Sequence, residues 1–502
     1  MQVANSKLIL ATALFVISTI HVLSARATGS AFLPSTHSAV KSGLLMPNPA
    51  YAPPNFQPEK DGFSHPFTSP SSVFSAVKEV FTSQSAEHDL FSYRHPNLQA
   101  DVNVYAGYES DHGDLGEYGF WYKGWKLSAR AWDNFHLRTD WYNGAFYGDL
   151  DAAETDPLID GYSKRFNRHI QLDNLNGELA WKNEDITLTL GRGRFQIGNS
   201  ISGSIILNDQ VNDYGYLKAE AALGDFRMSL LHASLMADST YSIHNNNHID
   251  QRQYPDKFLA LHQLSYFPTT ALELFIGETV VYGNRSLDIN YLLPNSFWRA
   301  TEHNLWDRDN VMIYAGGNLA LGKSTKLYAQ FALDEFSYGK IFTNWWGNKY
   351  AVQAGAEQYL PNLRLVAEIT AVRPYTYAHF MNHTMYSHDA SPLGFPQGSN
   401  VVDISLEANV TPLPFIQIDS RISYRHRGSD GNSWQDNYHD IFAEEIDTAT
   451  TEWFAGSKSD EYQIISSLAI PLWGHHKLLM GHDSIRTDGW MHKLFAAWQF
   501  IY

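Results

Sequence analysis

Cysteine is absent from the 502-residue chain, and after the first 27 residues no apolar run approaches the length of a transmembrane helix. The first absence excludes disulfides, thiolate metal sites and the acylated N-terminal cysteine of a lipoprotein. The second argues against a helical membrane protein. Basic residues are also few, since 36 Lys and Arg stand against 53 Asp and Glu. Nucleic acid is therefore not an expected partner.

One short apolar run near the N-terminus predicts a secretory signal peptide over residues 1–27. Lys7 precedes the apolar residues 8–23, and residues 25–27 supply a small-x-small cleavage site. We expect the mature chain to begin near Thr28. The alternative is an uncleaved anchor helix, although the run is short for a membrane span and His21 interrupts its end.

Residues 28–100 differ in composition from the rest of the chain. The stretch 34–70 is rich in Pro, Ser and Asn, and the stretch 71–83 carries Val and Phe residues on one helical face. We interpret this segment as a loose periplasmic arm with one short helix. A plug inserted into the lumen of a barrel is the alternative.

From residue 101 to the end, the apolar residues recur with a period of two, which is typical of strands with one apolar face. Leu363, Leu365, Ala367 and Ile369 alternate with Arg364, Glu368 and Thr370. Each segment has about the ten residues that cross an apolar slab at a tilt. Eighteen strands are predicted near 101–109, 117–123, 125–135, 178–183, 186–193, 216–223, 226–235, 258–267, 271–282, 310–321, 325–334, 350–359, 362–373, 401–411, 415–426, 461–470, 476–485 and 491–502.

The connections between these segments indicate a membrane barrel. Short turns alternate with long loops, and the predicted long loops are 136–177, 194–215, 236–257, 283–309, 374–400 and 427–460. Such a pattern is typical of a transmembrane up-and-down β-barrel with short periplasmic turns and long outer loops. Aromatic residues make up 14% of the chain, as interfacial girdles require. An even strand count places both termini in the periplasm.

The last strand has a further sign of an outer-membrane protein. Leu494, Trp498, Phe500 and Tyr502 alternate up to an aromatic terminus, which resembles the signal read by the barrel-insertion machinery, although Phe495 and Ile501 would point inward. We therefore expect an all-β barrel over 101–502 in the cell outer membrane, in contact with lipid and with the insertion machinery during biogenesis.

Several loop motifs resemble the capsule assembly protein Wzi family. They are Arg373-Pro374-Tyr375-Thr376-Tyr377-Ala378-His379, Tyr386-Ser387-His388, Pro392-Leu393-Gly394 and Gly398-Ser399-Asn400, with further matches at Gly277-Glu278, Tyr291-Leu292-Leu293-Pro294, Asp309-Asn310 and Leu333-Asp334-Glu335-Phe336. The similarity runs from about Asp101 to the end. The chain departs from the family at its N-terminus, which is too poor in helix for the periplasmic helical bundle of that family.

The resemblance implies an eighteen-stranded lectin that is not an enzyme and that holds capsular or extracellular polysaccharide at the cell surface. A porin-type channel for sugars or small solutes is the alternative, because an eighteen-stranded lumen is wide enough for water. A barrel with a lipid-modifying active site is a third possibility. No serine has a base partner that the sequence reveals.

A polysaccharide site needs aromatic faces for sugar C–H groups and planar polar groups for hydroxyls. The predicted outer loops contain both. The glycan-binding candidates are Trp298, Trp306, Asp309, Asn310, Trp345, Trp346, Arg373, Tyr375, Tyr377, His379 and Trp434. The alternative for each aromatic residue is packing over the barrel mouth or a place in the outer girdle.

Charged residues of both signs fall on the predicted lumen face. They are Asp334, Glu357, Arg364, Glu368, Asp403, Glu407, Asp419, Arg421 and Arg425. Such a set could line a water-filled channel or form a network that closes the lumen, and a solvated wall is the plainest interpretation.

No metal site or cofactor is expected. His379, His383 and His388 lie in a loop without a helix signature, so the spacing that shares an ion on a helix face does not apply. Loop 427–460 is strongly acidic, but Asp430-x-Asn432 lacks the full calcium-loop pattern. A hydrated acidic loop is the preferred interpretation.

Overall fold

The computed structural model describes residues 90–160, 163–237, 241–244, 250–341, 343–413, 415–472 and 475–502. The predicted signal peptide and the helix at 71–83 lie outside these residues. No helix within the described part of the chain is long and apolar enough to cross a membrane.

Eighteen antiparallel strands form one closed barrel, which confirms the predicted fold class and strand count. Ring closure is made by β24 and β2, which pair from Tyr105↔Ile501 to Gly113↔Lys493. The barrel strands are β2 (Leu98–Gly113), β3 (Gly116–Ala131), β4 (Phe135–Gly148), β6 (Ile170–Lys182), β7 (Ile186–Gly193), β8 (Tyr214–Leu223), β9 (Phe226–Met236), β12 (Asp256–Thr269), β13 (Leu272–Gly283), β14 (Asn310–Leu321), β15 (Thr325–Glu335), β16 (Lys349–Leu360), β17 (Leu363–Val372), β20 (Val401–Leu413), β21 (Ile416–Gly428), β22 (Lys458–Pro471), β23 (His476–Arg486) and β24 (Trp490–Ile501).

Smaller elements decorate the barrel. The strand β1 (Phe91–His95) pairs with the start of β2, so the end of the predicted N-terminal arm is itself a strand. The others are α4 (Leu150–Ala153), η1 (Pro157–Asp160), β5 (Ser163–Arg165), β10 (Tyr241–His244), β11 (Asp250–Gln253), η2 (Ile289–Leu292), α5 (Trp298–Asn304), η3 (Tyr338–Lys340), β18 (Ser387–His388), β19 (Ser391–Pro392), α6 (Tyr438–Phe442) and η4 (Ala443–Glu445).

Two predicted strands proved to be one. The segments 117–123 and 125–135 belong to β3, and the missed strand β4 lies inside the predicted loop 136–177. The turn predicted at Gly124 is wrong. A Cβ at Gly124 would lie 2.5 Å from the Tyr105 ring, so this glycine makes room for a neighbouring side chain inside a continuous strand. The strand β4 carries aromatic side chains on both faces, because Tyr142 and Phe146 point inward and Trp141 points outward. The alternation of apolar and polar residues is therefore not visible in its sequence.

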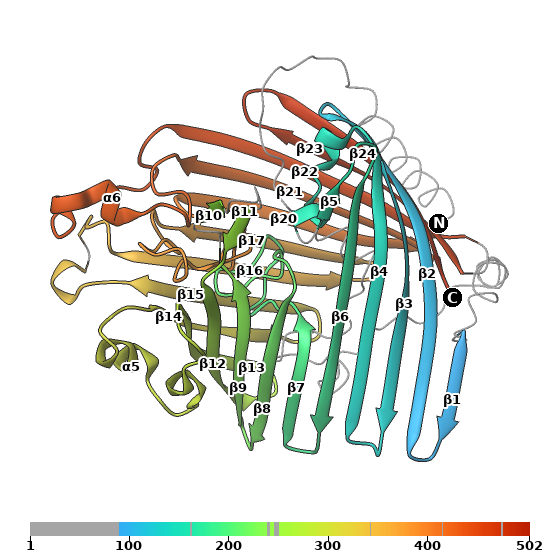
Figure 1. Cartoon of the computed structure of the whole chain (residues 1–502), viewed down its shortest axis with the longest axis horizontal. Coiled ribbons are helices and arrows are strands. Elements are labelled where there is room, and N and C mark those ends of the chain that lie inside the picture. Colours follow the sequence, from blue (N-terminus) through green and yellow to red (C-terminus); the bar gives the residue numbers. More distant parts are fainter. Residues whose placement is uncertain are drawn as a thin grey trace.

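The connections separate into two rims. One rim has only brief turns: 132–134, 183–185, 224–225, 270–271, 322–324, 361–362, 414–415 and 472–475. The other rim has the long loops 149–169, 194–213, 237–255, 284–309, 336–348, 373–400 and 429–457, with brief turns at 114–115 and 487–489. In Figure 1 the turns after β3, β6 and β8 lie along the lower edge, whereas α5 and α6 extend to the left.

Each strand places alternate side chains on opposite faces of the wall. In β17 the outward Leu365 and Ile369 are exposed, whereas the inward Glu368 and Thr370 are buried. Phe495 and Ile501 of β24 point inward, as the pattern of the last strand predicted. The outward face is the apolar one, as a lipid-facing barrel requires.

The lumen is not filled with water throughout. Two long loops fold into it, and their apolar side chains form a core with the inner wall from β8 to β20. Ile205 and Leu207 come from loop 194–213, and Tyr377 and Phe395 come from loop 373–400. These side chains are fully buried. A predominantly polar lumen wall, as the sequence predicted, is therefore found only where this core does not reach.

Candidate functional site

Loop 194–213 spans the whole lumen. It connects β7 and β8, the fifth and sixth strands of the ring, yet the guanidinium of Arg421 on β21, the fifteenth strand, donates a hydrogen bond to the carbonyl of Ile201. The strand β21 is nine strands away from β8, which is half of the eighteen-strand ring. The loop thus reaches the opposite wall and divides the lumen.

The tip of this loop is held by one carboxylate on β17. Glu368 accepts hydrogen bonds from Ser200 Oγ at 3.0 Å and from the backbone N–H groups of Ile201 and Ser202 at 3.1 Å. Ser202 Oγ donates a further bond, and Tyr328 Oη on β15 donates one at 2.6 Å. Four of the five donors belong to the loop, so Glu368 is its principal anchor.

Amide side chains provide a second attachment. Gln353 Nε2 on β16 donates to Ser200 Oγ and to the Gly203 carbonyl, both at 3.0 Å. Asn199 donates to Asn318 on β14 and accepts from Lys326 Nζ at 3.2 Å. The loop is therefore fixed to four consecutive wall strands, β14 to β17, and to β21.

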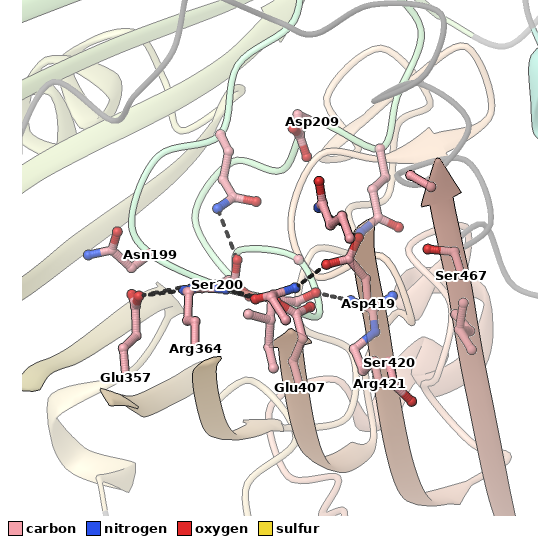
Figure 2. Close-up of a pocket in the computed structure, with 18 of the residues that line it drawn as sticks. Asn199, Ser200, Asp209, Glu357, Arg364, Glu407, Asp419, Ser420, Arg421 and Ser467 are labelled. Carbon is pink, nitrogen blue, oxygen red and sulfur yellow. Dashed lines mark hydrogen bonds and ion pairs between the residues drawn. The ribbon is translucent and has the colours of Figure 1, made fainter. Parts of the chain in front are cut away.

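A polar cavity of about 670 Å³ lies between this loop and the wall. Figure 2 shows the loop above the cavity and strands of the wall, with Arg364, Glu407 and Arg421, below it. Several lining residues, such as Gln417 and Lys477, lie within a few positions of the brief turns 414–415 and 472–475. The cavity thus occupies the short-turn half of the lumen.

An ionic chain runs along the floor of this cavity (Figure 2). Arg364 on β17 contacts Glu357 on β16 at 3.0 Å and Glu407 on β20 at 2.9 Å. It also donates to Asn409, whose amide donates to Asp419 on β21 at 2.8 Å. These groups are rigidly placed by paired strands, and a polar ligand would find donors and acceptors already oriented.

A second ionic group lies in the buried part of the wall. Arg425 on β21 contacts Asp403 at 2.8 Å, forms an ion pair with Glu461, and donates to Gln463 at 2.9 Å. Gln463 in turn donates to Asp483 at 3.1 Å. The structure therefore places most of the predicted lumen residues in two networks. Of the others, Glu368 and Arg421 lie on wall strands and contact loop 194–213, and Asp334 accepts the Tyr377 N–H at 2.9 Å.

Most predicted glycan-binding residues are packed within the loops. Trp306 is the exception, with 91% of its surface exposed. Trp298, Asp309, Asn310, Trp346, Arg373, Tyr375, Tyr377 and His379 are buried, and Trp345 and Trp434 are half-buried. Burial does not test glycan contact by these residues, but it leaves Trp306 as the accessible member of the set.

An aromatic cluster holds three loops of the long-loop rim together. Trp346 lies 4.6 Å from Tyr438 and 4.9 Å from Phe442, and Tyr375 lies 5.1 Å from Phe442, between ring centroids. Trp346 Nε1 donates to the Ile446 carbonyl at 2.6 Å. Aromatic packing therefore joins loops 336–348, 373–400 and 429–457, as expected if these aromatic residues pack over the barrel mouth.

His388 provides a pH-sensitive contact in loop 373–400. Its Nδ1 accepts the Met236 N–H at 2.9 Å, so it must be unprotonated. Burial, together with the nearby charges of Lys257 and Arg192, lowers the pKa of His388 to about 4. Neutral His388 thus stabilises the folded state fully above the unfolded pKa near 6.5, and this stabilisation is lost as the pH falls through about 4. The shift of the His388 pKa corresponds to on the order of 3 kcal/mol of folding free energy.

We expect hydrogen exchange at Met236, corrected for its intrinsic pH dependence, to accelerate when the pH falls from 7 to 4. The substitution His388→Asn keeps an acceptor near the same place but does not titrate in this range. It should remove the pH dependence of Met236 exchange. An unchanged pH dependence in this variant would show that another group controls the contact.

Metal-ligand geometry is restricted to one group among the described residues. Carboxylate and imidazole atoms of Glu302, His303 and Asp307 lie close enough to share an ion. Arg299 already contacts Glu302 at 2.5 Å and Asp307 at 3.6 Å. A guanidinium therefore balances these carboxylates, and we assign them no metal.

Two groups of serine and histidine side chains that the sequence did not reveal lie on the outer face of the barrel. Ser110 Oγ is 2.8 Å from His112 Nε2, and Ser484 Oγ is 2.6 Å from both His482 Nε2 and His492 Nδ1. His112 is near Glu117, whose side chain is 74% exposed. Neither group has a buried carboxylate behind a histidine within the described part of the chain, so we assign neither a catalytic role.

Comparison with known proteins identifies the fold but no sequence family. No protein-family model and no curated protein matches the chain. The structure is similar to Wzi of Escherichia coli, which is described as an outer-membrane protein involved in group 1 capsule assembly and as a carbohydrate-binding β-barrel. The two structures match with a TM-score of 0.51 and 12% sequence identity, over 80% of this chain and 84% of Wzi. The Pseudomonas aeruginosa protein OpdO (OccK3) matches with TM-score 0.45 and 13% identity over 81% of this chain and 95% of its own. OprD of the same organism matches with TM-score 0.43 and 8% identity over 80% and 95%. The fold is thus that of an outer-membrane β-barrel.

Proposed function

We propose that this chain is a non-enzymatic outer-membrane barrel that binds capsular or other extracellular polysaccharide and helps to anchor it at the cell surface. In this proposal the long loops face outward and both termini face the periplasm. The loop motifs that resemble the Wzi family and the similarity to a carbohydrate-binding barrel support it. Membership of that family remains a prediction.

The observation that carries the proposal is the polar cavity beneath loop 194–213. Its volume of about 670 Å³ is within the range of small-ligand sites. Arg364, Asn409 and Asp419 present planar polar groups suited to sugar hydroxyls, while Ile465 and Leu479 supply apolar surface suited to C–H groups. The loop that forms its roof crosses the lumen, so a ligand would enter from the short-turn rim, which faces the periplasm in this proposal, and would be held rather than passed.

A glycan array probed with the detergent-purified protein tests the proposal, because detergent leaves both rims accessible. We expect retention of acidic or neutral oligosaccharides of the capsular type. Replacement of Arg364 with alanine should weaken binding about 10- to 100-fold, the usual value of a hydrogen bond to a charged group. Trp306→Ala tests the exposed rim aromatic in the same way.

The matched control is Arg138→Ala, because Arg138 is an inward arginine on β4, in the opposite part of the wall. Its affinity for the retained glycan should equal that of the unmodified protein. Absence of retention on every glycan, or unchanged affinity in both Arg364→Ala and Trp306→Ala, would overturn the proposal or its assignment of the site.

A solute channel is the second candidate function. The observation in its favour is that loop 194–213 narrows the lumen and brings charges of both signs to the constriction. Pores select solutes by the width of such a constriction and by the charged side chains that line it. Steady single-channel conductance of the unmodified protein in planar bilayers would support the channel. Its absence would support a closed binder.

A further inference from the structure

Loop 284–309 folds over the outside of the barrel wall rather than over its mouth. In β12 and β13 the side chains of Leu259, Leu261 and Val281 belong to the lumen core, so the alternate positions face outward. Those outward positions include His262, Glu278 and Tyr282, and all three are contacted by the loop. Figure 1 shows α5 beside β12 and β14, outside the strands.

The contact between this loop and the wall is extensive. The Trp298 ring of α5 stacks on the His262 imidazole with centroids 3.9 Å apart, and Trp298 is fully buried. Glu278 accepts the N–H groups of Trp298 at 2.9 Å and Arg299 at 3.1 Å, at the start of α5. Together with Tyr291, these residues fix the loop as a lobe, which we define as residues 284–309.

The lobe covers the upper part of an outward row whose lower part is bare. Leu264 and Ile276, one step below His262 and Glu278 in the same row, are 41% and 55% exposed. Tyr266 and Phe226 stack at 4.8 Å near the short-turn rim, where an aromatic girdle is expected. His262 is four residues above Tyr266, which is roughly 10 Å along the barrel axis for a strand tilted by about 40°.

This depth lies inside the apolar band, which is roughly 25 Å tall in barrels of this kind. Phe258, at the upper end of the covered row, is eight residues above Tyr266 and thus roughly 20 Å from it along the axis. An uncovered carboxylate at the position of Glu278 would face lipid, which is costly. The lobe removes that cost because its N–H groups and His262 satisfy Glu278.

The lobe exposes several large apolar side chains. Ile289 is 72% exposed, Leu293 51% and Phe297 58%, while the neighbouring Tyr291 and Trp298 are buried against the wall. An aqueous loop rarely exposes a contiguous set of large apolar side chains. Here the exposed set belongs to a loop that packs on the same outward row as the exposed Leu264 and Ile276.

We propose that the face of the lobe formed by Ile289, Leu293 and Phe297 is embedded in the outer leaflet of the membrane, against lipid acyl chains. The packing of the lobe on the outward, lipid-facing row of the barrel favours lipid over a protein partner. The lobe then replaces part of the barrel's own lipid-facing surface and buries the His262–Glu278 pair beneath it. This inference depends on the barrel fold and not on any bound glycan.

Spin labelling tests the proposal, because the chain has no cysteine and each label site is therefore unique. Phe297→Cys and Ile289→Cys carry the label in the lobe. Leu406→Cys, an outward position in the middle of β20, is the lipid-facing control, and Glu444→Cys in η4 is the aqueous control. The labelled full-length protein is inserted in vesicles of phosphatidylethanolamine and phosphatidylglycerol.

Accessibility to oxygen and to a water-soluble nickel chelate is measured by power saturation. We expect both lobe sites to match Leu406→Cys, with a several-fold higher ratio of oxygen to nickel accessibility than Glu444→Cys. Nickel accessibility equal to that of Glu444→Cys would place the lobe in water and overturn the proposal. Low accessibility to both probes would mean that protein, such as a second copy of this chain, covers the lobe, and would overturn it too. Heat-modifiable gel mobility confirms that each variant is folded.

Discussion

Replacing Glu368 with alanine is expected to free loop 194–213 from the wall and to raise the conductance of the barrel in planar bilayers. Four loop donors and Tyr328 Oη lose their common acceptor. Each buried donor left without a partner costs about 1–3 kcal/mol, and partial rescue by water leaves a net loss of about 3 kcal/mol. The population of open loop should then rise about 100-fold.

The matched control for this experiment is Glu407→Ala. Glu407 is also an inward carboxylate, on the adjacent strand β20, but its ion-pair partner is Arg364 and not a loop atom. Its removal should leave the conductance near that of the unmodified protein. Equal conductance of Glu368→Ala and the unmodified protein would show that the apolar core of the lumen, rather than Glu368, holds the loop in place.

Replacing Arg425 with methionine is expected to give the largest loss of stability among single substitutions in the wall. The Arg425 guanidinium lies between Asp403 and Glu461, and all three side chains are buried. Removal of the cation leaves two buried carboxylates without their ion pair, at a cost of about 3–5 kcal/mol. The measurement is the urea midpoint of the detergent-purified barrel, followed by tryptophan fluorescence.

Arg364→Met is the comparison for the Arg425 variant. Its side chain is 30% exposed and lines the cavity, so water can solvate the carboxylates that it leaves. We expect a much smaller shift of the urea midpoint. The double variant with Asp403→Asn should recover part of the stability lost by Arg425→Met, and a failure to do so would argue against the ion pair as the source of that stability.

The sequence determined which face of most strands is apolar, because that property is local. In β17 and β20 the period of two distinguishes Leu365 and Leu406 from Glu368 and Glu407 without knowledge of any neighbour. The strand count and the segregation of long loops to one rim follow from the same local signal. The signal failed at β4, where lumen packing places aromatic side chains on both faces of the strand.

The arrangement of the candidate site could not be predicted from the sequence, because it depends on contacts between segments that are far apart in the chain. The sequence singled out Glu368 and Arg421 as lumen residues, but it gave no sign that loop 194–213 would lie across the lumen and contact both of them. The cavity is defined by that crossing. The outer loops carried the predicted aromatic residues, yet three loops pack them against one another and leave Trp306 exposed.

The sequence by itself determined that this chain makes a barrel of amphipathic strands, since alternation of side chains is a property of each extended segment alone. Only the tertiary structure decided what fills the lumen and what covers the wall. Glu368 and Ser202 are separated by 166 positions, and Glu278 meets Trp298 across a loop that turns outward. Such contacts arise when the ring closes and the loops bury their own apolar side chains. No local sequence pattern shows whether a loop will bury them inside the lumen or against the outer face of the wall.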